Sequence, residues 1–176
     1  GLVVVGLVVV VLGLSVFTVN ERELAIKLQL GRVVETGYDP GLHFKWPIVQ
    51  NVRKFPRRIL TISDRPERVF TAENEALQVD FFVKWRIVKP EIFYTSFMGD
   101  ERQANQRLLQ IIKNGLQLEF DQRTIQQVVA DDRVEMMESL TLKGNEQVAG
   151  FGIEIVDVRI KQIELPGRWG GGGPLK

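Results

Sequence analysis

The stretch from Leu77 to Ile87, "LQVDFFVKWRI", carries the clearest secondary-structure signal in the chain and decides its fold class. Apolar side chains fill every second position, and polar or charged side chains fill most positions between them. A period of two places successive side chains on opposite faces of a strand, so one face is predicted to be buried. The residues predicted to be buried are Leu77, Val79, Phe81, Val83, Trp85 and Ile87.

The sequence before this strand predicts two further strands. Residues 67–71, "ERVFT", are expected to pair with it as a hairpin, with residues 72–76, "AENEA", as the connection. Apolar and polar residues also alternate from Leu24 to Leu30, which predicts a half-buried strand that ends at Gly31.

Helical spacing replaces strand spacing after the hairpin. Residues 90–98, "PEIFYTSFM", predict a short helix, and Asp100 is expected to cap a longer one. Asp121 is expected to cap another short helix, and Asp131 or Asp132 to begin the last long one. The apolar stripe predicted for the helix after Asp100 consists of Leu108, Ile111, Ile112 and Leu116, with Leu118 at its margin.

A closing strand is predicted over residues 152–166, "GIEIVDVRIKQIELP". Its apolar phase slips by one position at Ile155 and Val156, which indicates a bulge or a strand buried on both faces.

The order of these elements predicts an α+β fold in two lobes. Residues 20–88 are expected to form a β-rich subdomain, and residues 89–166 a helical α/β subdomain. Residues 167–176 are rich in glycine and are interpreted as a linker or a non-native addition.

Residues 2–19 precede the predicted lobes and contain no charged side chain. As a helix they would measure about 27 Å, close to the roughly 30 Å of a bilayer's hydrocarbon core. A cleaved signal peptide is the alternative, but the segment shows neither a basic flank nor a small-x-small cleavage site. A transmembrane anchor over residues 2–19 is therefore expected.

Composition excludes several classes of function. The formal net charge is +1, which provides no long-range field to attract nucleic acid. The sequence contains no cysteine, so disulfides, thiolate nucleophiles and cysteine-based metal sites are excluded.

The residues that enzymatic chemistry requires are scarce. His43 is the only histidine, and no G-x-S-x-G or phosphate-binding loop motif occurs. A membrane-bound serine hydrolase that uses Ser63, Ser96 or Ser139 is the weaker alternative to a binding protein. No catalytic residue, cofactor or metal site is predicted.

The segment "PGLHFKWP", residues 40–47, is short, apolar and bounded by prolines. His43 within it is interpreted as a turn residue. Because tryptophan favours the interface between lipid and water, the segment is predicted to touch a membrane. The predicted contact residues are Leu42, Phe44, Trp46 and Ile48, and burial of Phe44 or Trp46 in the core is the alternative.

A basic run follows this segment and consists of Arg53, Lys54, Arg57 and Arg58. These side chains are predicted to contact anionic lipid headgroups or an acidic neighbouring subunit. The alternative is a charged strand edge that discourages aggregation.

Three segments add a resemblance that periodicity does not provide. They are residues 20–59, residues 77–94 and residues 152–166, in this order after an apolar segment. Together they resemble the SPFH (band 7, prohibitin-like) family over residues 2–166.

The resemblance implies a scaffold and not an enzyme. Within the family the chain is most similar to the members that pair with HflK and modulate the AAA protease FtsH. The implied partners are an HflK-like SPFH protein in a hetero-oligomer, an FtsH-like AAA protease and the lipid bilayer. The implied location is the bacterial inner membrane, single-pass, with the folded part in the periplasm. Another stomatin- or prohibitin-type membrane-organising scaffold is the alternative.

Overall fold

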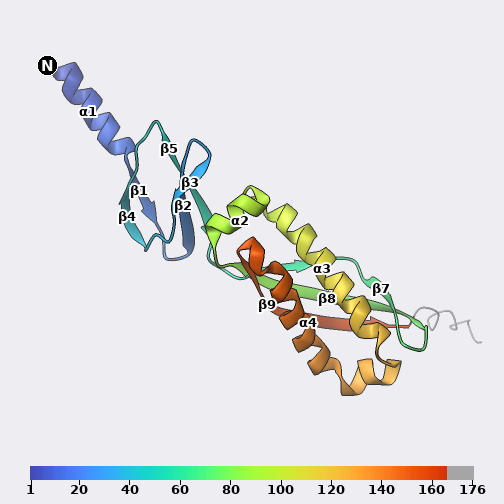
Figure 1. Ribbon diagram of the computed structural model, residues 1–176. Coiled ribbons are helices and arrows are strands. Elements are labelled where there is room, and N and C mark those ends of the chain that lie inside the picture. The colour runs from blue at the N-terminus through green and yellow to red at the C-terminus, as the bar shows by residue number, and fades with distance from the viewer. Residues whose placement is uncertain (166–176) are drawn as a thin grey trace, which may run out of the picture. The chain divides into compact units, whose positions relative to one another are not determined.

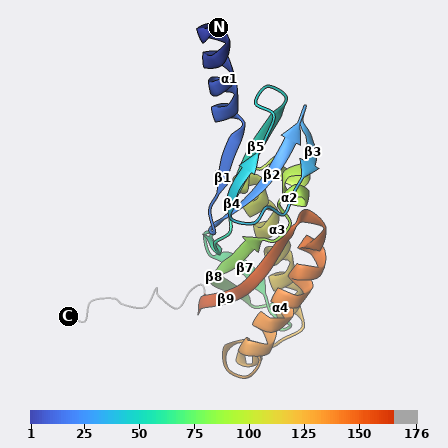
Figure 2. The same ribbon diagram turned by 90° about the vertical axis from the view of Figure 1, so that its left-hand side faces the viewer.

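The computed structural model describes residues 1–165, which group into two compact units, each built from separate stretches of chain (Figures 1 and 2). The first unit contains residues 1–58 and 87–99, and the second contains residues 59–86 and the described residues from 100 onward. The Gly-rich segment 167–176 lies outside the described residues. The α+β class predicted from the sequence is confirmed.

The first unit contains one N-terminal helix, two small antiparallel sheets and a short second helix. Strand β1 pairs with β4 in one sheet, and the order in the other sheet is β3-β2-β5. The elements are α1 (Leu2–Leu14), β1 (Val16–Val19), β2 (Glu23–Gln29), β3 (Arg32–Glu35), β4 (Gly41–Phe44), β5 (Gln50–Pro56) and α2 (Pro90–Phe97).

Strand β2 was predicted to be half-buried, and the structure buries both of its faces. Ala25, Ile26, Lys27 and Leu28 are all buried, because β2 lies between β3 and β5 and also contacts α2 and β1. The Lys27 ammonium is neutralised there by the Glu35 carboxylate at 2.9 Å, as a buried charge requires.

The N-terminal helix is shorter than predicted, which corrects the expected transmembrane anchor over residues 2–19. Helix α1 ends at Leu14, and the Ser15 hydroxyl donates to the Val11 carbonyl at 2.6 Å. Residues 16–19 form strand β1 because they find a pairing partner in β4, and β-branched residues suit a strand. Within residues 1–165, no helix is both long enough and apolar enough to cross a membrane.

The second unit consists of a sheet with two long helices on one face, as both views show (Figures 1 and 2). Strands β6, β7 and β9 all pair with the long strand β8. The elements are β6 (Leu60–Ser63), β7 (Glu67–Phe70), β8 (Ala76–Ile87), α3 (Glu101–Asp121), η1 (Gln127–Asp131), α4 (Arg133–Val148), η2 (Ala149–Phe151) and β9 (Ile153–Glu164).

The main predictions for this unit are confirmed. The predicted face of β8 is buried along its whole length, and β7 pairs with β8 in the predicted hairpin. Asp100 caps α3, because its carboxylate accepts the backbone N–H of Arg102 at 2.9 Å. The stripe from Leu108 to Leu116 is buried, whereas Leu118 is exposed.

One prediction is corrected at the end of α3, and another is confirmed along β9. Asp121 ends α3 and does not cap the next turn; there the hydroxyl of Thr124 accepts the backbone N–H of Gln127. Burial along β9 changes phase after Ile155, as predicted. Asn145 of α4 makes two hydrogen bonds with the backbone of Ile155, at 2.9 and 2.7 Å, which joins the helix to the strand.

Candidate functional site

Helix α1 presents only apolar side chains and glycine to its surroundings. Its valine and leucine side chains are between 41% and 92% exposed, and none is buried. A helix that is apolar on every side and exposed on every side requires an apolar medium or partner. This helix is therefore the first part of a candidate contact surface.

The ribbon of β1 and β4 continues this surface. Val16 lies opposite Phe44 in the pairing register, and they are 47% and 55% exposed. Leu42 is exposed two residues before Phe44. Successive side chains alternate between faces, so Phe17 and His43 point inward, where both pack against Tyr38.

The loop between β4 and β5 lies at the end of α1. The backbone N–H of Lys45 donates to the carbonyl of Ser15 at 2.6 Å, so the loop begins beside the last turn of the helix. Trp46 and Ile48 in this loop are 68% and 94% exposed. The side-chain oxygen of Gln50 accepts a hydrogen bond from the backbone N–H of Trp46, which stabilises the loop.

A second loop reaches the same end of the unit. Leu30, which is 86% exposed, follows Gln29 at the tip of the β2–β3 hairpin. Gln29 pairs with Gln50, the residue that closes the Trp46 loop. We call the resulting surface the apolar edge; it consists of helix α1 with Val16, Leu30, Leu42, Phe44, Trp46 and Ile48.

The segments that build the apolar edge carry only positive charges. Residues 2–18, 28–34 and 40–54 contain no aspartate or glutamate. Lys45 lies within the Trp46 loop, and Arg32 pairs with Gln29 beside Leu30. Cations around an apolar surface are the arrangement that favours contact with anionic lipid.

The structure brings the four predicted membrane-contact residues together on one surface. Phe44 and Trp46 are exposed, which speaks against the alternative that they pack in the core. Val16 and Leu30 were not predicted from the sequence, since only strand pairing brings them to this edge. Membrane contact itself stays a prediction.

His43 was predicted to lie in a turn, and this is corrected because it lies within strand β4. Its Nε2 is 2.6 Å from the Asp39 carbonyl oxygen. Its ring centroid lies 4.6 Å from that of Tyr38 and 5.5 Å from that of Phe17. The histidine thus supports the ribbon from its inner side.

The four basic residues do not form one patch. Arg53 lies over the ring of Tyr94 at 5.8 Å, and Lys54 forms an ion pair with Glu23 at 3.4 Å. Arg57 and Arg58 follow the end of β5. The Trp46 loop precedes the start of β5, so the two arginines lie about 20 Å from that loop along the strand. Their distance from the apolar edge favours a partner other than the lipid that this edge would contact.

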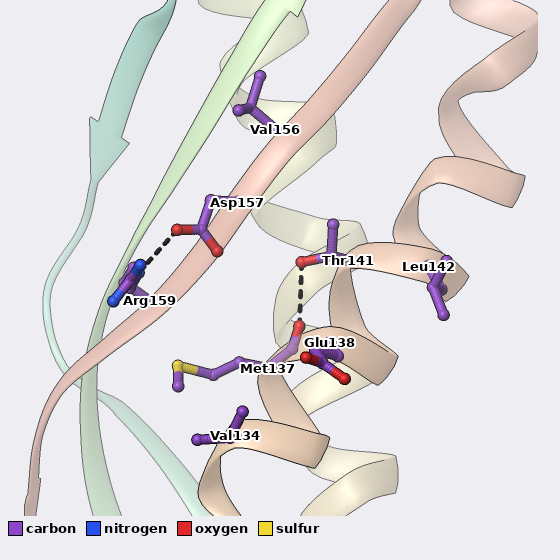
Figure 3. A pocket seen from close by; sticks show the side chains of 8 residues that line it. All are labelled: Val134, Met137, Glu138, Thr141, Leu142, Val156, Asp157 and Arg159. Carbon is purple, nitrogen blue, oxygen red and sulfur yellow. Dashed lines mark hydrogen bonds and ion pairs between the residues drawn. The ribbon is translucent and has the colours of Figure 1, made fainter.

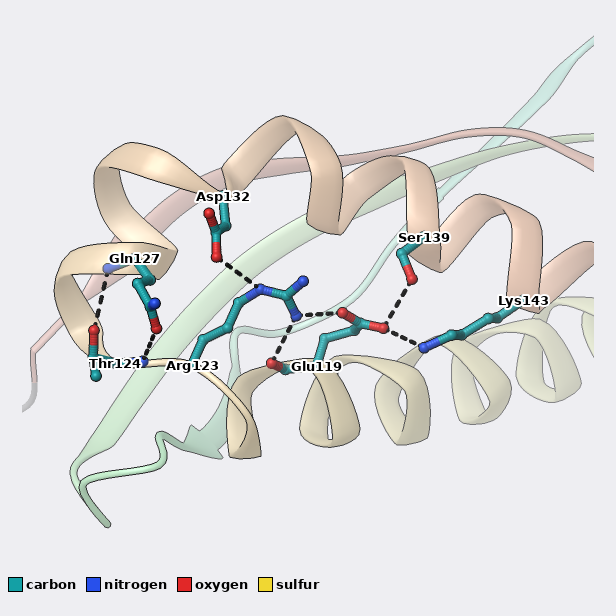
Figure 4. Close-up of polar contacts among 7 residues, drawn as sticks. All are labelled: Glu119, Arg123, Thr124, Gln127, Asp132, Ser139 and Lys143. Atoms are coloured by element: carbon teal, nitrogen blue, oxygen red, sulfur yellow. Dashed lines mark hydrogen bonds and ion pairs between the residues drawn. The ribbon is translucent and has the colours of Figure 1, made fainter.

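The second unit contains a buried charge network centred on Glu119, which is 3% exposed (Figure 4). Its carboxylate accepts hydrogen bonds from Arg123, from the Ser139 hydroxyl at 2.9 Å and from Lys143 at 2.6 Å. Burial raises the pKa of Glu119, but the hydrogen bonds from Lys143, Ser139 and Arg123 outweigh burial and hold this pKa below its ordinary value. The network joins α3 to α4.

The three candidate serine nucleophiles show no catalytic arrangement. Ser139 donates to Glu119, and Lys143 is held by the same carboxylate as a charged donor, so it is not a free base. Ser63 and Ser96 are exposed, and within residues 1–165 neither side chain forms a hydrogen bond with a histidine or a lysine. Over the same residues, no cluster of histidine and carboxylate side chains has the arrangement of a metal site.

An open cavity of about 500 Å³ lies between α4 and β9 (Figure 3). Val134, Met137, Leu142 and Val156 give it apolar walls. Two of its charged side chains, Asp157 and Arg159, are paired at 2.7 Å, and Glu138 adds a further carboxylate to the lining. The cavity is a place for apolar contact.

Comparison with known proteins gives a consistent family match. A family described as "SPFH domain / Band 7 family" matches residues 17–168. "Protein HflC" of Haemophilus influenzae is 36% identical over 162 residues, which cover 86% of this chain and 55% of that protein. "Modulator of FtsH protease HflC" of Escherichia coli K12 is 32% identical over 206 residues, which cover 91% of this chain and 62% of that protein.

"Protein HflC" of Buchnera aphidicola from Acyrthosiphon pisum is 33% identical, with 89% of this chain and 57% of that protein covered. The chain thus spans between 55% and 62% of the length of these three relatives.

Proposed function

Because the chain belongs to the SPFH domain / Band 7 family, with relatives named HflC, we propose that it is a membrane-attached scaffold that modulates an FtsH-like AAA protease. One relative is named as a modulator of FtsH protease. The chain acts in this proposal by binding, as a regulator with no catalytic residue of its own.

The observation that carries membrane attachment is the apolar edge. Trp46 and Ile48 are exposed on a loop beside the end of a wholly apolar helix. The segments that form it carry four cations, Arg32, Lys45, Arg53 and Lys54, and no carboxylate. We propose that the edge inserts into a leaflet, with Lys45 and Arg32 at the headgroups. A bacterial inner membrane with the folded units in the periplasm is part of the proposal.

The assembly partner in this proposal is an HflK-like SPFH protein, and the contact residues are Arg57 and Arg58. Both side chains are exposed and lie at the end of β5 remote from the apolar edge. A chain attached through the apolar edge would therefore leave these two arginines available to an acidic neighbouring subunit.

Reconstitution in vesicles tests this proposal. The chain, an HflK-like partner and an FtsH-like protease are combined, and degradation of a membrane substrate and recovery of the partner are measured. The native chain is expected to change the degradation rate and to recover the partner. The Arg57→Glu/Arg58→Glu variant is expected to lose at least tenfold in partner recovery while it stays bound to vesicles.

The control is Glu73→Lys, an exposed charge reversal in the β7–β8 connection. An unchanged degradation rate with the native chain contradicts modulation of the protease. If the arginine variant leaves the vesicles instead of the partner, these arginines contact headgroups and the proposed partner surface is wrong.

A further inference from the structure

Strand β9 has one edge that carries no other strand. Within residues 1–165, β9 pairs with β8 alone. Successive residues of a strand direct their backbone N–H and C=O groups alternately to its two sides. The second edge of β9 therefore presents backbone groups that a further strand or another amide can bind.

Helix α4 binds this free edge at two points. The carboxamide of Asn145 accepts the N–H of Ile155 at 2.7 Å and donates to its carbonyl at 2.9 Å. The guanidinium of Arg133 donates to the carbonyl of Ile160. Within residues 1–165, α4 makes no hydrogen bond to the backbone of residues 156–159 between these points. The free edge is thus bound by an amide at one end and left open in its middle.

The open cavity of about 500 Å³ lies beside this middle stretch (Figure 3). Met137 extends from the helix toward the strand in this view, and methionine adapts its shape to different partners. Val134 and Leu142 at the margin are 65% and 68% exposed. The cavity therefore places an adaptable apolar wall next to an open strand edge. Its lining consists of Val156, Asp157 and Arg159 from β9 and of Val134, Met137, Glu138, Thr141 and Leu142 from α4.

The charged side chains of the cavity favour a cationic occupant. Its lining holds two carboxylates, Asp157 and Glu138, and one guanidinium, Arg159. Asp157 and Arg159 form an ion pair at 2.7 Å and neutralise each other. In the part of the chain that the structure describes, Glu138 forms no ion pair. An occupant with a positive charge near Glu138 is therefore complementary to the cavity.

We propose that the groove between α4 and β9 binds a short extended segment of another polypeptide, which adds to the free edge of β9. Its main-chain amides bind the backbone of residues 156–159 as the Asn145 carboxamide binds Ile155. Side chains at alternate positions of an extended segment share one face. Two apolar side chains of the segment therefore enter the cavity, and a lysine or arginine two positions further on reaches Glu138.

The open form of the cavity favours a polypeptide over a small molecule. Small-molecule sites usually bury most of their ligand, whereas this cavity is open to solvent beside the exposed Val134 and Leu142. A polypeptide segment can continue along the strand beyond both ends of the cavity. The inference goes beyond the proposed function, because it requires neither the membrane nor the protease.

Binding of a labelled peptide to the full chain tests this inference. The probe is a fluorescein-labelled heptapeptide in which two valines and then a lysine alternate with threonines, so that the valines and the lysine share one face. Its fluorescence anisotropy is measured while the full chain in non-ionic detergent is added. The native chain is expected to bind the probe saturably. Glu138→Lys is expected to bind it at least tenfold more weakly, because like charges then face each other.

Two altered peptides and one matched variant separate the contributions. A peptide with glutamate in place of lysine should bind Glu138→Lys better than it binds the native chain, which also shows that this variant is folded. The lysine peptide with methylated backbone nitrogens should bind the native chain at least tenfold more weakly, because it cannot donate hydrogen bonds to β9. Glu146→Lys is the control, an exposed charge reversal on α4 outside the cavity, and should bind the lysine peptide like the native chain.

A further variant, Val134→Ser/Leu142→Ser, removes exposed apolar side chains from the cavity wall and should weaken binding of the lysine peptide at least tenfold. If it leaves peptide binding unchanged and instead reduces self-association in sedimentation velocity, a second copy covers the cavity and the proposal is wrong. Absence of saturable binding to the native chain, undiminished binding by Glu138→Lys, or undiminished binding of the methylated peptide would each overturn the proposal.

Discussion

Replacement of Glu119 with alanine is expected to lower the free energy of unfolding by about 3 kcal/mol, which is a large part of the stability of an ordinary domain. The substitution leaves Arg123, whose side chain is only 14% exposed, without its carboxylate partner on α3. Arg123 keeps Asp132 at 3.3 Å, so the loss lies at the lower end of the range for a broken buried pair. Urea denaturation of the chain in detergent measures the change.

Glu138→Ala is the matched control, because it removes an exposed carboxylate from α4 that forms no ion pair within residues 1–165. Its effect should stay within about 0.5 kcal/mol. Equal losses for the two variants would contradict the role of the Glu119 network in joining α3 to α4.

Acid should remove the stabilisation that Glu119 gives to the folded chain. The pKa of Glu119 is lowered in the folded chain, so the unfolded state takes up a proton at higher pH than the folded state does. The stabilisation is therefore present above the ordinary glutamate pKa and is lost as the pH falls through the lowered value. The difference in stability between the native chain and Glu119→Ala should shrink over that interval.

Substitution of Trp46 and Ile48 with serine is expected to speed the transfer of the chain between vesicles by about a hundredfold. The two side chains are 68% and 94% exposed in the structure and would be buried in lipid. Loss of their burial costs about 3 kcal/mol in total, which corresponds to about a factor of a hundred. Transfer from donor to acceptor vesicles of anionic phospholipid measures the rate.

Leu118→Ser is the control for this prediction, since Leu118 is 62% exposed on α3 and lies outside the apolar edge. It should leave the transfer rate unchanged. If the double variant also transfers at the native rate, the Trp46 loop does not hold the chain in the membrane.

The sequence pattern within a single element was enough to predict the elements whose buried residues recur at the spacing of that helix or strand. The alternation from Leu77 to Ile87 identified β8 and its buried face, and the hairpin partner followed from its position. The cap at Asp100 was also predictable, because an N-cap depends on neighbouring residues alone.

The features that the sequence could not provide depend on contacts between distant residues. The composition of the apolar run from residue 2 to residue 19 does not show whether its last residues form a helix or a strand. Pairing of Val16 with Phe44 decides for strand. The burial of Lys27 depends likewise on Glu35, eight positions along the chain.

The candidate surface was predictable only in part. An apolar segment bounded by two prolines indicated Trp46, but Leu30 reaches the same edge only through the pairing of Gln29 with Gln50. The Glu119 network was missed, although Arg123 follows Glu119 by four residues just beyond the end of α3, because Lys143 joins it from another helix.

Quenching of Trp46 by brominated lipid tests membrane contact through the apolar edge most directly. Trp169→Phe removes the tryptophan outside the described residues, and Trp85, fully buried in the second unit, serves as an internal reference. In vesicles, the emission of Trp46 should shift to the blue and be quenched, and Trp46→Phe should abolish the quenching. Vesicle-bound chain in which Trp46 stays unquenched would contradict the account.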